Sequence, residues 1–508
     1  MIKTLKERYP LMKEIIQYFN EVCINELLKV SENLYRDPSK FAEYIEELKE
    51  TLNKLGVEII KETLEEMDMA IKNSVKRKMN WHVEKKDCEK DLITTLGTVS
   101  FMKTLYVSKE KNEDGKFEMC YLLDKVMGFE ENQRLTEDAM VKVYEEAVQT
   151  SYRRGGESVN ESDSISKTAV KDMLHKTKFP EIIPEEPEKK KVDYLYIDAD
   201  EDHYALQFQE KKGDLEVSEN GRKKNGAITK LVYVYEGVAP EAPGSKRNKL
   251  INTKYFCSGC DESNKEFWAR IRRYVYTAYD MEGIKKIYIN SDGGAWIKEG
   301  MNQLGSIEYV LDEFHLSKYV LKMTSHMLDS KEDARVGVCK IIRDGTKKEF
   351  DEIVERLEGC AKTESQLKRI QEAAKYIKNN WTAAKRRLWR RNGVCACSAE
   401  GHVSHVLSSR MSTLALGWSR LGTSKMARLR EWHYNKNSML ELVRSQKAEL
   451  PMVAGAEELI MSASDIISSE INRRTKAETI SGKYEEIMNT TLGLKTKKQL
   501  SIYVNRWI

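Results

Sequence analysis

Three widely separated acidic residues are candidates for holding metal ions. Asp198 ends one apolar segment of the sequence and Asp292 follows another, while Glu400 stands in the segment Cys397-Ser-Ala-Glu-Gly-His402. Carboxylates at strand ends are typical ligands of Mg²⁺, a hard ion that prefers oxygen and keeps several of its waters. Two such ions, held roughly 3.5–4 Å apart, activate an attacking hydroxyl and stabilise the leaving oxygen in phosphodiester chemistry. The acids therefore indicate phosphoryl transfer with two Mg²⁺ ions, for which Mn²⁺ could substitute.

The elements that would position these acids begin at Val192. The residue pattern predicts three strands, a crossover helix and a fourth strand, at 192–209, 227–237, 250–257, 262–278 and 286–290. Three strands that can form an antiparallel meander, followed by a helix and a parallel strand, match an α/β (α+β) RNase H-like core better than a doubly wound sheet. The first and fourth strands are neighbours in such a core. Asp198 and Asp292 should then lie side by side, where their repulsion calls for a cation.

A longer plan of the chain follows from the same patterns. A helix at 295–304 and a fifth strand at 307–311 should complete the first part of the core. Helical period without strand signal then predicts an all-helical insertion before the segment of Glu400. The expected regions are an N-terminal helical region at 1–90, a β-hairpin and helix-turn-helix-like region at 91–178, a linker at 179–191, the first part of the core at 192–316, the helical insertion at 317–392, the second part of the core at 393–431 and a helical C-terminal region at 432–508.

The region before the core is interpreted as DNA-binding. Amphipathic helices are predicted over 11–78, where apolar residues recur at three and four spacing, and a small β hairpin is predicted at 92–107. Helical period returns before Arg153-Arg-Gly-Gly156, which should break it, and resumes at 166–176. This pattern resembles a helix-turn-helix, whose second helix would present Lys167, Thr168 and Lys171 to phosphates and base edges. An ordinary helical hairpin is the alternative, since such patterns often arise by chance.

A second basic cluster lies at the end of the predicted insertion. The run Lys385-Arg-Arg-Leu-Trp-Arg-Arg391 interleaves cations with an aromatic ring. Neutralised phosphates provide most of the sequence-independent affinity for DNA, and Trp389 could stack on a base or wedge a distorted end. A solvated basic helix is the alternative. The DNA contacts predicted from this cluster and the residues after it are Lys385, Arg386, Arg387, Trp389, Arg390, Arg391, Arg410, Trp418 and Arg420.

Other residues near the main acids allow further roles. Cys257-x-x-Cys260 and the group Cys395, Cys397, His402 and His405 offer thiolate and imidazole ligands at short spacing, as zinc sites do. No second paired knuckle lies near Cys257, and the two histidines flank Glu400, where they could equally contact DNA. We therefore predict supporting roles for His402 and His405. Rival acids are Asp200, Asp202, Asp312 and Glu313, of which Asp200 and Asp202 could serve as alternative ligands beside Asp198.

Composition limits the class of protein without identifying it. Of 508 residues, 40% are hydrophobic and 33% charged, which is typical of a globular protein with several domains. The net charge of +4 is too small to indicate nucleic-acid binding by itself. Nine scattered Cys fit a reducing compartment, and the sequence lacks an apolar run of roughly 18 residues or more that could span a membrane. We expect a cytoplasmic, nucleoid-associated protein with no membrane partner.

Four segments give the sequence a resemblance to a known family. They are Tyr196-Ile-Asp-Ala-Asp-Glu-Asp-His203, Asn290-Ser-Asp-Gly-Gly-Ala-Trp-Ile297, Leu311-Asp-Glu-Phe-His-Leu-Ser-Lys318 and the segment 398–410, with the hairpin region at 92–107 in addition. In these segments the chain resembles bacterial insertion-sequence transposases of the ISLre group, which are related at their core to Mutator-like DDE transposases. The resemblance implies that Asp198, Asp292 and Glu400 form the catalytic, metal-binding triad. It also implies a supporting role for Asp312 and His315, whose Asp-x-x-His spacing looks like a signature of that core.

The function implied by this resemblance is DNA transposition. Such an enzyme binds the terminal inverted repeats of its insertion sequence, hydrolyses DNA strands to free 3′-hydroxyls and joins these to target DNA. No covalent protein intermediate is needed. Because two element ends must meet, we expect a homodimer or larger assembly on double-stranded DNA. Two alternatives remain open: a catalytically decayed DNA-binding protein of the same element, and a host RNase H-like nuclease.

Overall fold

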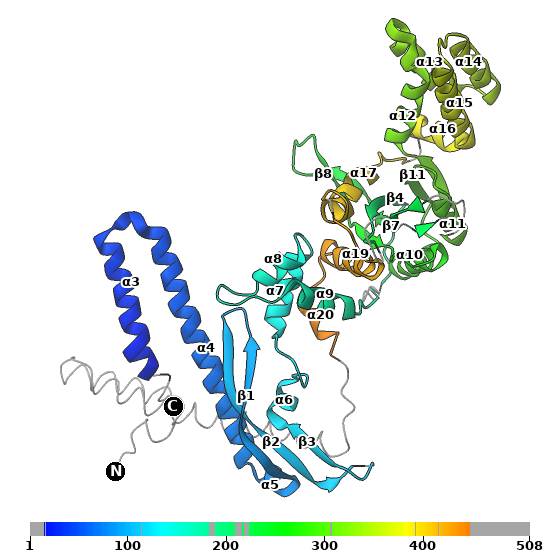
Figure 1. The fold of residues 1–508 in the computed structure, drawn as a ribbon. Coiled ribbons are helices and arrows are strands. Elements are labelled where there is room, and N and C mark those ends of the chain that lie inside the picture. The colour runs from blue at the N-terminus through cyan, green and yellow to red at the C-terminus, as the bar shows by residue number, and fades with distance from the viewer. Residues whose placement is uncertain are drawn as a thin grey trace, which may run out of the picture. The chain divides into compact units, whose positions relative to one another are not determined.

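The chain forms two compact units (Figure 1). The computed structural model describes residues 15–447, except 16, 113, 182–187, 209–215, 218–222, 305–306, 392 and 415. Part of the predicted linker, and residues 448–508 of the predicted C-terminal region, lie outside the described residues. The first unit spans Met1–Val143, Arg153–Lys167 and Lys447–Ile508, and the second spans Tyr144–Tyr152 and Thr168–Gln446. No helix in the described residues has the length and apolar character needed to cross a membrane.

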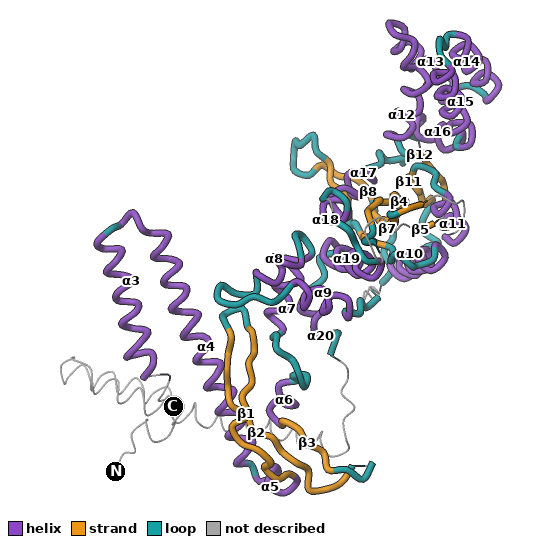
Figure 2. The backbone as a smooth tube through the Cα atoms, in the orientation of Figure 1, coloured by secondary structure: helices purple, strands orange, loops and turns teal. Residues whose placement is uncertain are grey.

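The first unit combines packed helices with a three-stranded antiparallel sheet (Figure 2). The sheet order is β1-β2-β3, so the predicted hairpin is the centre of a larger sheet. Strand β1 begins at Trp81, inside the region predicted to be helical. Residues 84–89 of this strand are mostly charged and mostly exposed. They therefore lack the alternation of apolar and polar residues that predicts a strand. The elements are η1 (Phe19–Cys23), α3 (Ile24–Arg36), η2 (Pro38–Lys40), α4 (Phe41–Asn73), α5 (Val75–Asn80), β1 (Trp81–Ile93), β2 (Thr98–Lys111), β3 (Phe117–Tyr121) and α6 (Leu122–Met127).

The segment predicted as a helix-turn-helix contains three helices, α7 (Glu137–Ala147), α8 (Tyr152–Glu157) and α9 (Lys167–Lys176). The prediction that Arg153-Arg-Gly-Gly156 breaks the helical pattern is wrong, because these residues lie within α8. Gly156 has a packing role there, since a Cβ at this position would lie 2.1 Å from the carbonyl oxygen of Ile165. On α9, Val170 and Leu174 are buried, while Lys167 and Thr168 are exposed and Lys171 is half-buried.

The second unit is built on a mixed five-stranded sheet with the order β10-β7-β4-β11-β12. Its strands are β4 (Tyr194–Ala205), β7 (Gly226–Tyr235), β10 (Lys254–Cys257), β11 (Lys286–Ser291) and β12 (Ile307–Leu311). Strand β7 pairs antiparallel with β4 and β10, whereas β11 pairs parallel with β4 and β12. The predicted antiparallel meander, and the predicted neighbourhood of the first and fourth strands, are therefore present.

One predicted strand of this unit is divided. Residues 250–257 belong to two strands, β9 (Asn248–Ile251) and β10, because Asn252 between them has a φ of 50° that no strand accommodates. Strand β9 pairs with β8 (Gly237–Pro240) in a separate two-stranded sheet. The very short strands β5 (Glu216–Val217) and β6 (Lys223–Lys224) form another pair.

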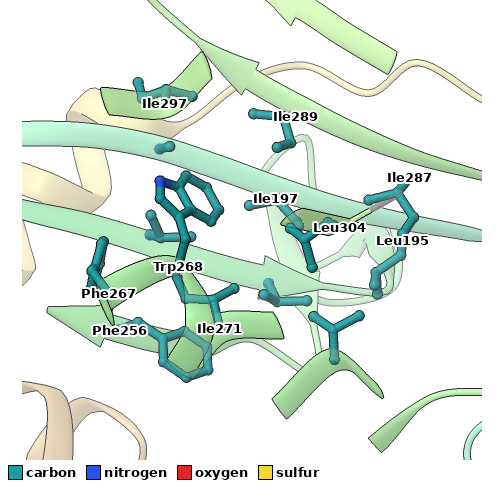
Figure 3. Close-up of a cluster of buried hydrophobic side chains, with 14 of the residues drawn as sticks. Leu195, Ile197, Phe256, Phe267, Trp268, Ile271, Ile287, Ile289, Ile297 and Leu304 are labelled. Carbon is teal, nitrogen blue, oxygen red and sulfur yellow. The ribbon is translucent and has the colours of Figure 1, made fainter. Parts of the chain in front are cut away.

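The core of the second unit lies between the sheet and two helices, α10 (Asn264–Ala278) and α11 (Ala295–Leu304). Alternate residues of β4 and β11 point to this side, as Figure 3 shows for Leu195, Ile197 and Ile289. Trp268 of α10 is fully buried among them, and its Nε1 donates a hydrogen bond of 2.9 Å to the carbonyl oxygen of Trp296. The apolar side of β4 is therefore covered by helices, and Asp198, Asp200 and Asp202 face the other side.

Replacing Gly300 by Ala should destabilise this unit. Gly300 lies in α11, and a Cβ at this position would lie 2.0 Å from the ring of the buried Trp268. The overpacking is expected to lower the free energy of unfolding by about 1–3 kcal/mol. Urea denaturation followed by circular dichroism measures the change. Gly337→Ala in α13 (Lys331–Asp344) is the matched control: the heavy atom nearest to the new Cβ would lie 3.7 Å away, so helix propensity should make that change neutral or slightly stabilising. Equal losses in both variants would contradict the argument.

A helical subdomain separates β12 from the last part of the unit (Figure 2). It has its own core, which contains Phe350, Ile370 and Ile377 and joins Leu311 at the end of β12. The remaining elements follow it in the chain and are short helices, apart from α19. The bounds are α12 (Glu313–Thr324), η3 (Ser325–Ser330), α13 (Lys331–Asp344), α14 (Lys347–Gly359), α15 (Glu364–Asn379), α16 (Trp381–Trp389), α17 (Ala399–Val403), η4 (Ser404–Ser408), α18 (Ser409–Met411), α19 (Arg420–Tyr434) and α20 (Met439–Arg444).

Candidate catalytic site

Three acids gather where the parallel strands end. Asn290 of β11 pairs with Asp198 of β4 at the end of the parallel ladder, and the charge of Asp292, which follows two residues later, acts on Asp200. Asp312 follows β12 at the same edge, where its backbone N–H donates a hydrogen bond of 2.8 Å to the carbonyl oxygen of Ser291. The predicted pairing of Asp292 with an acid of the first strand is therefore shifted by two residues, from Asp198 to Asp200.

The charges in this acid cluster act on one another. Burial raises the pKa of Asp200 to about 6, with the negative charges of Asp292 and Asp312 acting in the same direction and His315 opposing them. A carboxylate with such neighbours is stabilised in its ionised form by any nearby cation. Carboxylate oxygens are suitable ligands for a divalent metal ion, and a bound cation would relieve the repulsion between these acids.

The imidazole of His315 is the partner of Asp312 in this cluster. Its backbone N–H donates a 3.0 Å hydrogen bond to Oδ1 of Asp312, the N-cap of α12, and its Nδ1 lies 3.6 Å from the same oxygen. Although burial raises the pKa of Asp312, hydrogen bonds from His315 and Cys397 outweigh that effect and lower it to about 2. The interaction with Asp312 raises the pKa of His315, against the effect of its own burial, and the charges of Asp292 and Asp200 add to the rise.

The loop after β11 is held tightly by the helical subdomain. Oδ1 of Asp292 accepts a 2.9 Å hydrogen bond from the N–H of Gly294, and its carbonyl oxygen accepts a 2.5 Å hydrogen bond from Tyr376 of α15. Gly293 has a φ of 90°, and a Cβ there would lie 2.7 Å from the hydroxyl of Tyr309 and 2.8 Å from Oδ1 of Asn380. Only glycine fits at this position. The subdomain therefore fixes the backbone that carries Asp292.

Asp198, the first acid of the predicted triad, lies in the interior instead. It is completely buried. Its carboxylate accepts hydrogen bonds from the hydroxyls of Tyr233 and Tyr235, at 2.7 and 3.1 Å, from Nδ2 of Asn290 at 2.6 Å, and from the backbone N–H of Ser398 at 3.2 Å. Burial raises the pKa of Asp198, and these hydrogen bonds oppose the rise. Its oxygens are occupied by protein donors, which corrects the expectation that this acid stands open beside Asp292.

The network around Asp198 continues to a buried arginine. Arg387 of α16 is 1% exposed. Its guanidinium donates to Oδ1 of Asn290 at 2.6 Å, to the carbonyl oxygen of Leu311 at 2.8 Å and to that of Cys395 at 2.5 Å. The prediction that Arg387 contacts DNA is wrong, because this side chain lies inside the protein and holds together β11, β12 and the segment before α17. In the sequence, nothing marks Asn290 as a site residue except its place two residues before Asp292.

Glu400 stands on the first turn of α17, and its side chain is exposed. The chain just before it is tied to the sheet, since Ser398 donates its N–H to Asp198 and its hydroxyl lies 3.0 Å from that of Tyr233. Among the described residues, no group of three or more Asp, Glu, His or Cys side chains is arranged to hold a metal ion. Asp200, Asp292, Asp312 and His315 thus act on one another through their charges without being arranged to chelate a metal ion.

The two histidines after Glu400 differ in their surroundings. His402 packs against the ring of Tyr233, with centroids 4.4 Å apart, and its Nδ1 lies 2.8 Å from the hydroxyl of Tyr255. Burial lowers the pKa of His402 to about 4, so the ring is neutral at pH 7. His405 is exposed. Asp202, a rival acid, is buried and accepts hydrogen bonds from the hydroxyls of Ser408 and Ser412, both at 2.9 Å.

The other predicted DNA contacts divide into buried and exposed residues. Arg410 is 3% and Trp418 5% exposed, and the guanidinium lies 4.9 Å from the ring centroid, so the prediction of DNA contact is wrong for both. Arg386 pairs with Glu308 at 3.3 Å, and Arg390 pairs with Glu313. Lys385 donates to the carbonyl oxygen of Gly345 at 2.9 Å, and Arg420 lies 3.6 Å from Asp261. Trp389, Arg391 and Arg420 are exposed at the surface.

Comparisons with known proteins place the chain in a family. A model described as "Uncharacterised protein family (UPF0236)" matches residues 35–447. A UPF0236 protein of Caldanaerobacter subterraneus subsp. tengcongensis, under a name that joins eleven locus labels, is 35% identical over 479 residues, which are 94% of this chain and 93% of the relative. A UPF0236 protein of Streptococcus gallolyticus is 26% identical over 324 residues, which are 60% of this chain and 65% of the relative.

Among solved structures, the Drosophila P element transposase strand transfer complex matches with a TM-score of 0.25 and 11% identity, over 60% of this chain and 93% of that chain. A score this low does not establish a common fold. The family match and the relatives are sufficient without it, and the chain belongs to the uncharacterised protein family UPF0236.

Proposed function

We propose that this protein is a DDE transposase that binds the terminal inverted repeats of an insertion sequence and catalyses metal-dependent DNA strand cleavage and strand transfer. The observation that carries the proposal is the register of β4 and β11, which brings Asp200 level with Asp292 at the edge where Asp312 also lies. The strand order β10-β7-β4-β11-β12, antiparallel and then parallel, is the order of an RNase H-like core. The helical subdomain after β12 fits an insertion in that core.

The proposed metal ligands are Asp200 and Asp292, with Glu400 as the third. Bound Mg²⁺ or Mn²⁺ would activate the attacking water or 3′-hydroxyl and stabilise the leaving oxygen. Asp200 and Asp292 supply carboxylate oxygens, and His315, which lies beside Asp312, is proposed to contact a phosphate. Glu400 would join them through a movement of α17 when DNA binds, since its side chain is exposed in the free protein. Asp198 holds the segment before α17 in place through Ser398.

The partner is proposed to be double-stranded DNA, as element ends and as target. Exposed side chains are available for DNA contact on two segments. They are Lys167 and Thr168 on α9, and Trp389 and Arg391 at the end of the helical subdomain. A homodimer or larger assembly would bring two ends together, and the protein would act in the cytoplasm at the nucleoid. The names of the relatives give independent support. Eleven locus labels joined in one name, all from one strain, fit a gene present in many copies, as a mobile element would be.

Cleavage of DNA from the borders of the gene tests the proposal. Purified protein, incubated with labelled duplexes made from the sequence that flanks the coding region, should nick them in Mg²⁺ or Mn²⁺ and not in EDTA. Asp292→Asn should bind the same duplexes with unchanged affinity and cut them roughly 10³-fold more slowly, because it removes a metal ligand and keeps the side-chain shape.

Other results of this experiment would favour the alternatives. Binding of the border duplexes without cutting by the wild-type protein indicates a decayed DNA-binding protein. Metal-dependent cutting of unrelated duplexes at the same rate, without joining of strands, indicates a nuclease. Equal cutting by the wild type and Asp292→Asn would refute the proposed site.

A further inference from the structure

Two large aromatic side chains are exposed on α12 and at the end of α16. Phe314, on the first turn of α12, is 50% exposed, and Trp389, the last residue of α16, is 41% exposed. The two segments are joined by an ion pair between their neighbours Glu313 and Arg390. The helical subdomain buries its other large apolar residues, such as Phe350 and Ile377, in a compact core. Phe314 and Trp389 are therefore not part of that core.

Cations accompany both rings. Nζ of Lys318 lies 5.8 Å from the ring centroid of Phe314, and Lys385 and Arg391 lie 5.0 and 5.4 Å from that of Trp389. Lys318 and Arg391 are exposed. An aromatic face with cations around it offers stacking for a base and neutralisation for the phosphates on either side.

The position of this aromatic pair relates it to the acid cluster. Phe314 stands between Glu313 and His315, and its ring lies edge-on to the imidazole, with centroids 5.5 Å apart. Nδ1 of His315 lies 3.6 Å from Oδ1 of Asp312, which is the largest cause of its raised pKa, and the charges of Asp292 and Asp200 add to the rise. A DNA strand with its phosphate at the acids would place an adjacent nucleotide near Phe314, and the ion pair between Glu313 and Arg390 holds the segment of Trp389 at the same end of α12.

We propose that Phe314 and Trp389 form a binding site for an unpaired nucleotide base next to the phosphate that is cleaved. The inference rests on the proposed function and makes the substrate more specific: the DNA end is bound with at least one base out of the duplex stack. Unstacking a paired base costs free energy that stacking on an aromatic side chain returns only in part. The site should therefore favour DNA that is already unpaired at this position.

Binding of a fluorescent base tests this site without any need for cleavage. The probe is a duplex with one unpaired 2-aminopurine nucleotide, titrated with full-length protein in EDTA and compared with the fully paired duplex. Stacking should quench the fluorescence of the unpaired probe. Trp389→Ala and Phe314→Ala should each abolish most of the quenching and weaken binding of this probe about 10-fold. Phe314→Ala should leave binding of the paired duplex within about twofold, and both variants should keep the wild-type melting temperature.

Two control variants make the result specific. Trp389→Phe keeps an aromatic face and should retain the quenching. Tyr276→Ala removes an aromatic side chain of similar exposure, 38%, with Arg272 at 5.2 Å from its ring, but on α10, which covers the opposite face of the sheet. This change should have no effect. Wild-type quenching by both alanine variants would overturn the inference, as would an equal loss in Tyr276→Ala. Cutting of border DNA without quenching refutes this site alone, whereas quenching by a wild-type protein that never cuts refutes the proposed function alone.

Discussion

Replacing Asp200 by Asn should slow metal-dependent DNA cleavage by roughly 10³-fold or more, because the ions proposed at this site provide several kcal/mol of transition-state stabilisation. Asn keeps the shape of the side chain and loses the charge that a divalent cation needs. The register of β4 and β11 makes Asp200, and not Asp198, the neighbour of Asp292. Single-turnover cleavage of border duplexes at saturating protein measures the loss without interference from weaker binding.

The same substitution should stabilise the metal-free protein. Burial, with the charge of Asp292 adding to it, raises the pKa of Asp200 from 3.8 to about 6. The unfolded chain therefore loses this proton at lower pH than the folded one, and stability falls as the pH rises from about 4 to 6. Because an Asn side chain does not ionise, the variant does not lose this stability as the pH rises. The gain of Asp200→Asn, on the order of 1–3 kcal/mol, should be complete above pH 6 and absent below pH 4. Urea unfolding in EDTA at several pH values measures it.

Asp198→Asn is the matched control, two residues away on the same face of β4. Asn cannot accept all the hydrogen bonds that Tyr233, Tyr235, Asn290 and Ser398 donate to this carboxylate. One or more buried donors would be left unpaired, so the variant should lose about 1–3 kcal/mol of stability. Full cleavage by Asp200→Asn, together with loss of cleavage by a stably folded Asp198→Asn, would return the first metal ligand to Asp198.

The difference between these two acids shows what the sequence could determine. Strand limits and neighbours follow from apolar runs and turn residues, and β4, β7, β11 and β12 lie close to the predicted ranges. The choice among Asp198, Asp200 and Asp202 depends on register and on which donors face each carboxylate. These acids alternate along one face of β4, so the two-residue period treats them alike. Only packing distinguishes them: hydroxyls surround Asp198 and Asp202, whereas other charged groups surround Asp200.

The basic cluster at the end of α16 was harder to interpret from sequence. Helical period identifies the helix, but the five residues of the run that lie in α16, 385–389, span more than one turn and so point in every direction. Arg387 faces the sheet and is buried, Arg386 and Arg390 are paired with Glu308 and Glu313, and Trp389 remains exposed. Charge runs show where cations are and leave open which of them reach the solvent.

Arg387→Met should lower the free energy of unfolding by about 3–5 kcal/mol, the loss expected when one member of a buried polar network is removed. Met fills a similar volume and donates no hydrogen bond. The carbonyl oxygens of Leu311 and Cys395 and Oδ1 of Asn290 would lose their guanidinium donors in the interior. Asn290 also donates to Asp198, so the buried carboxylate loses the indirect influence of the positive charge. Denaturant unfolding followed by circular dichroism measures the change.

Arg386→Met is the matched control, because it is the adjacent residue of the same helix with the same change in chemistry. Arg386 is half-buried, and its ion pair with Glu308, at 3.3 Å, is partly open to solvent. Screened pairs of this kind contribute about 0–1 kcal/mol, so its loss should be small. If Arg387 instead served DNA, its replacement would weaken DNA binding and leave unfolding unchanged. A stability loss in Arg387→Met no larger than in Arg386→Met would therefore exclude the structural role, because a solvated arginine has no buried acceptors to abandon.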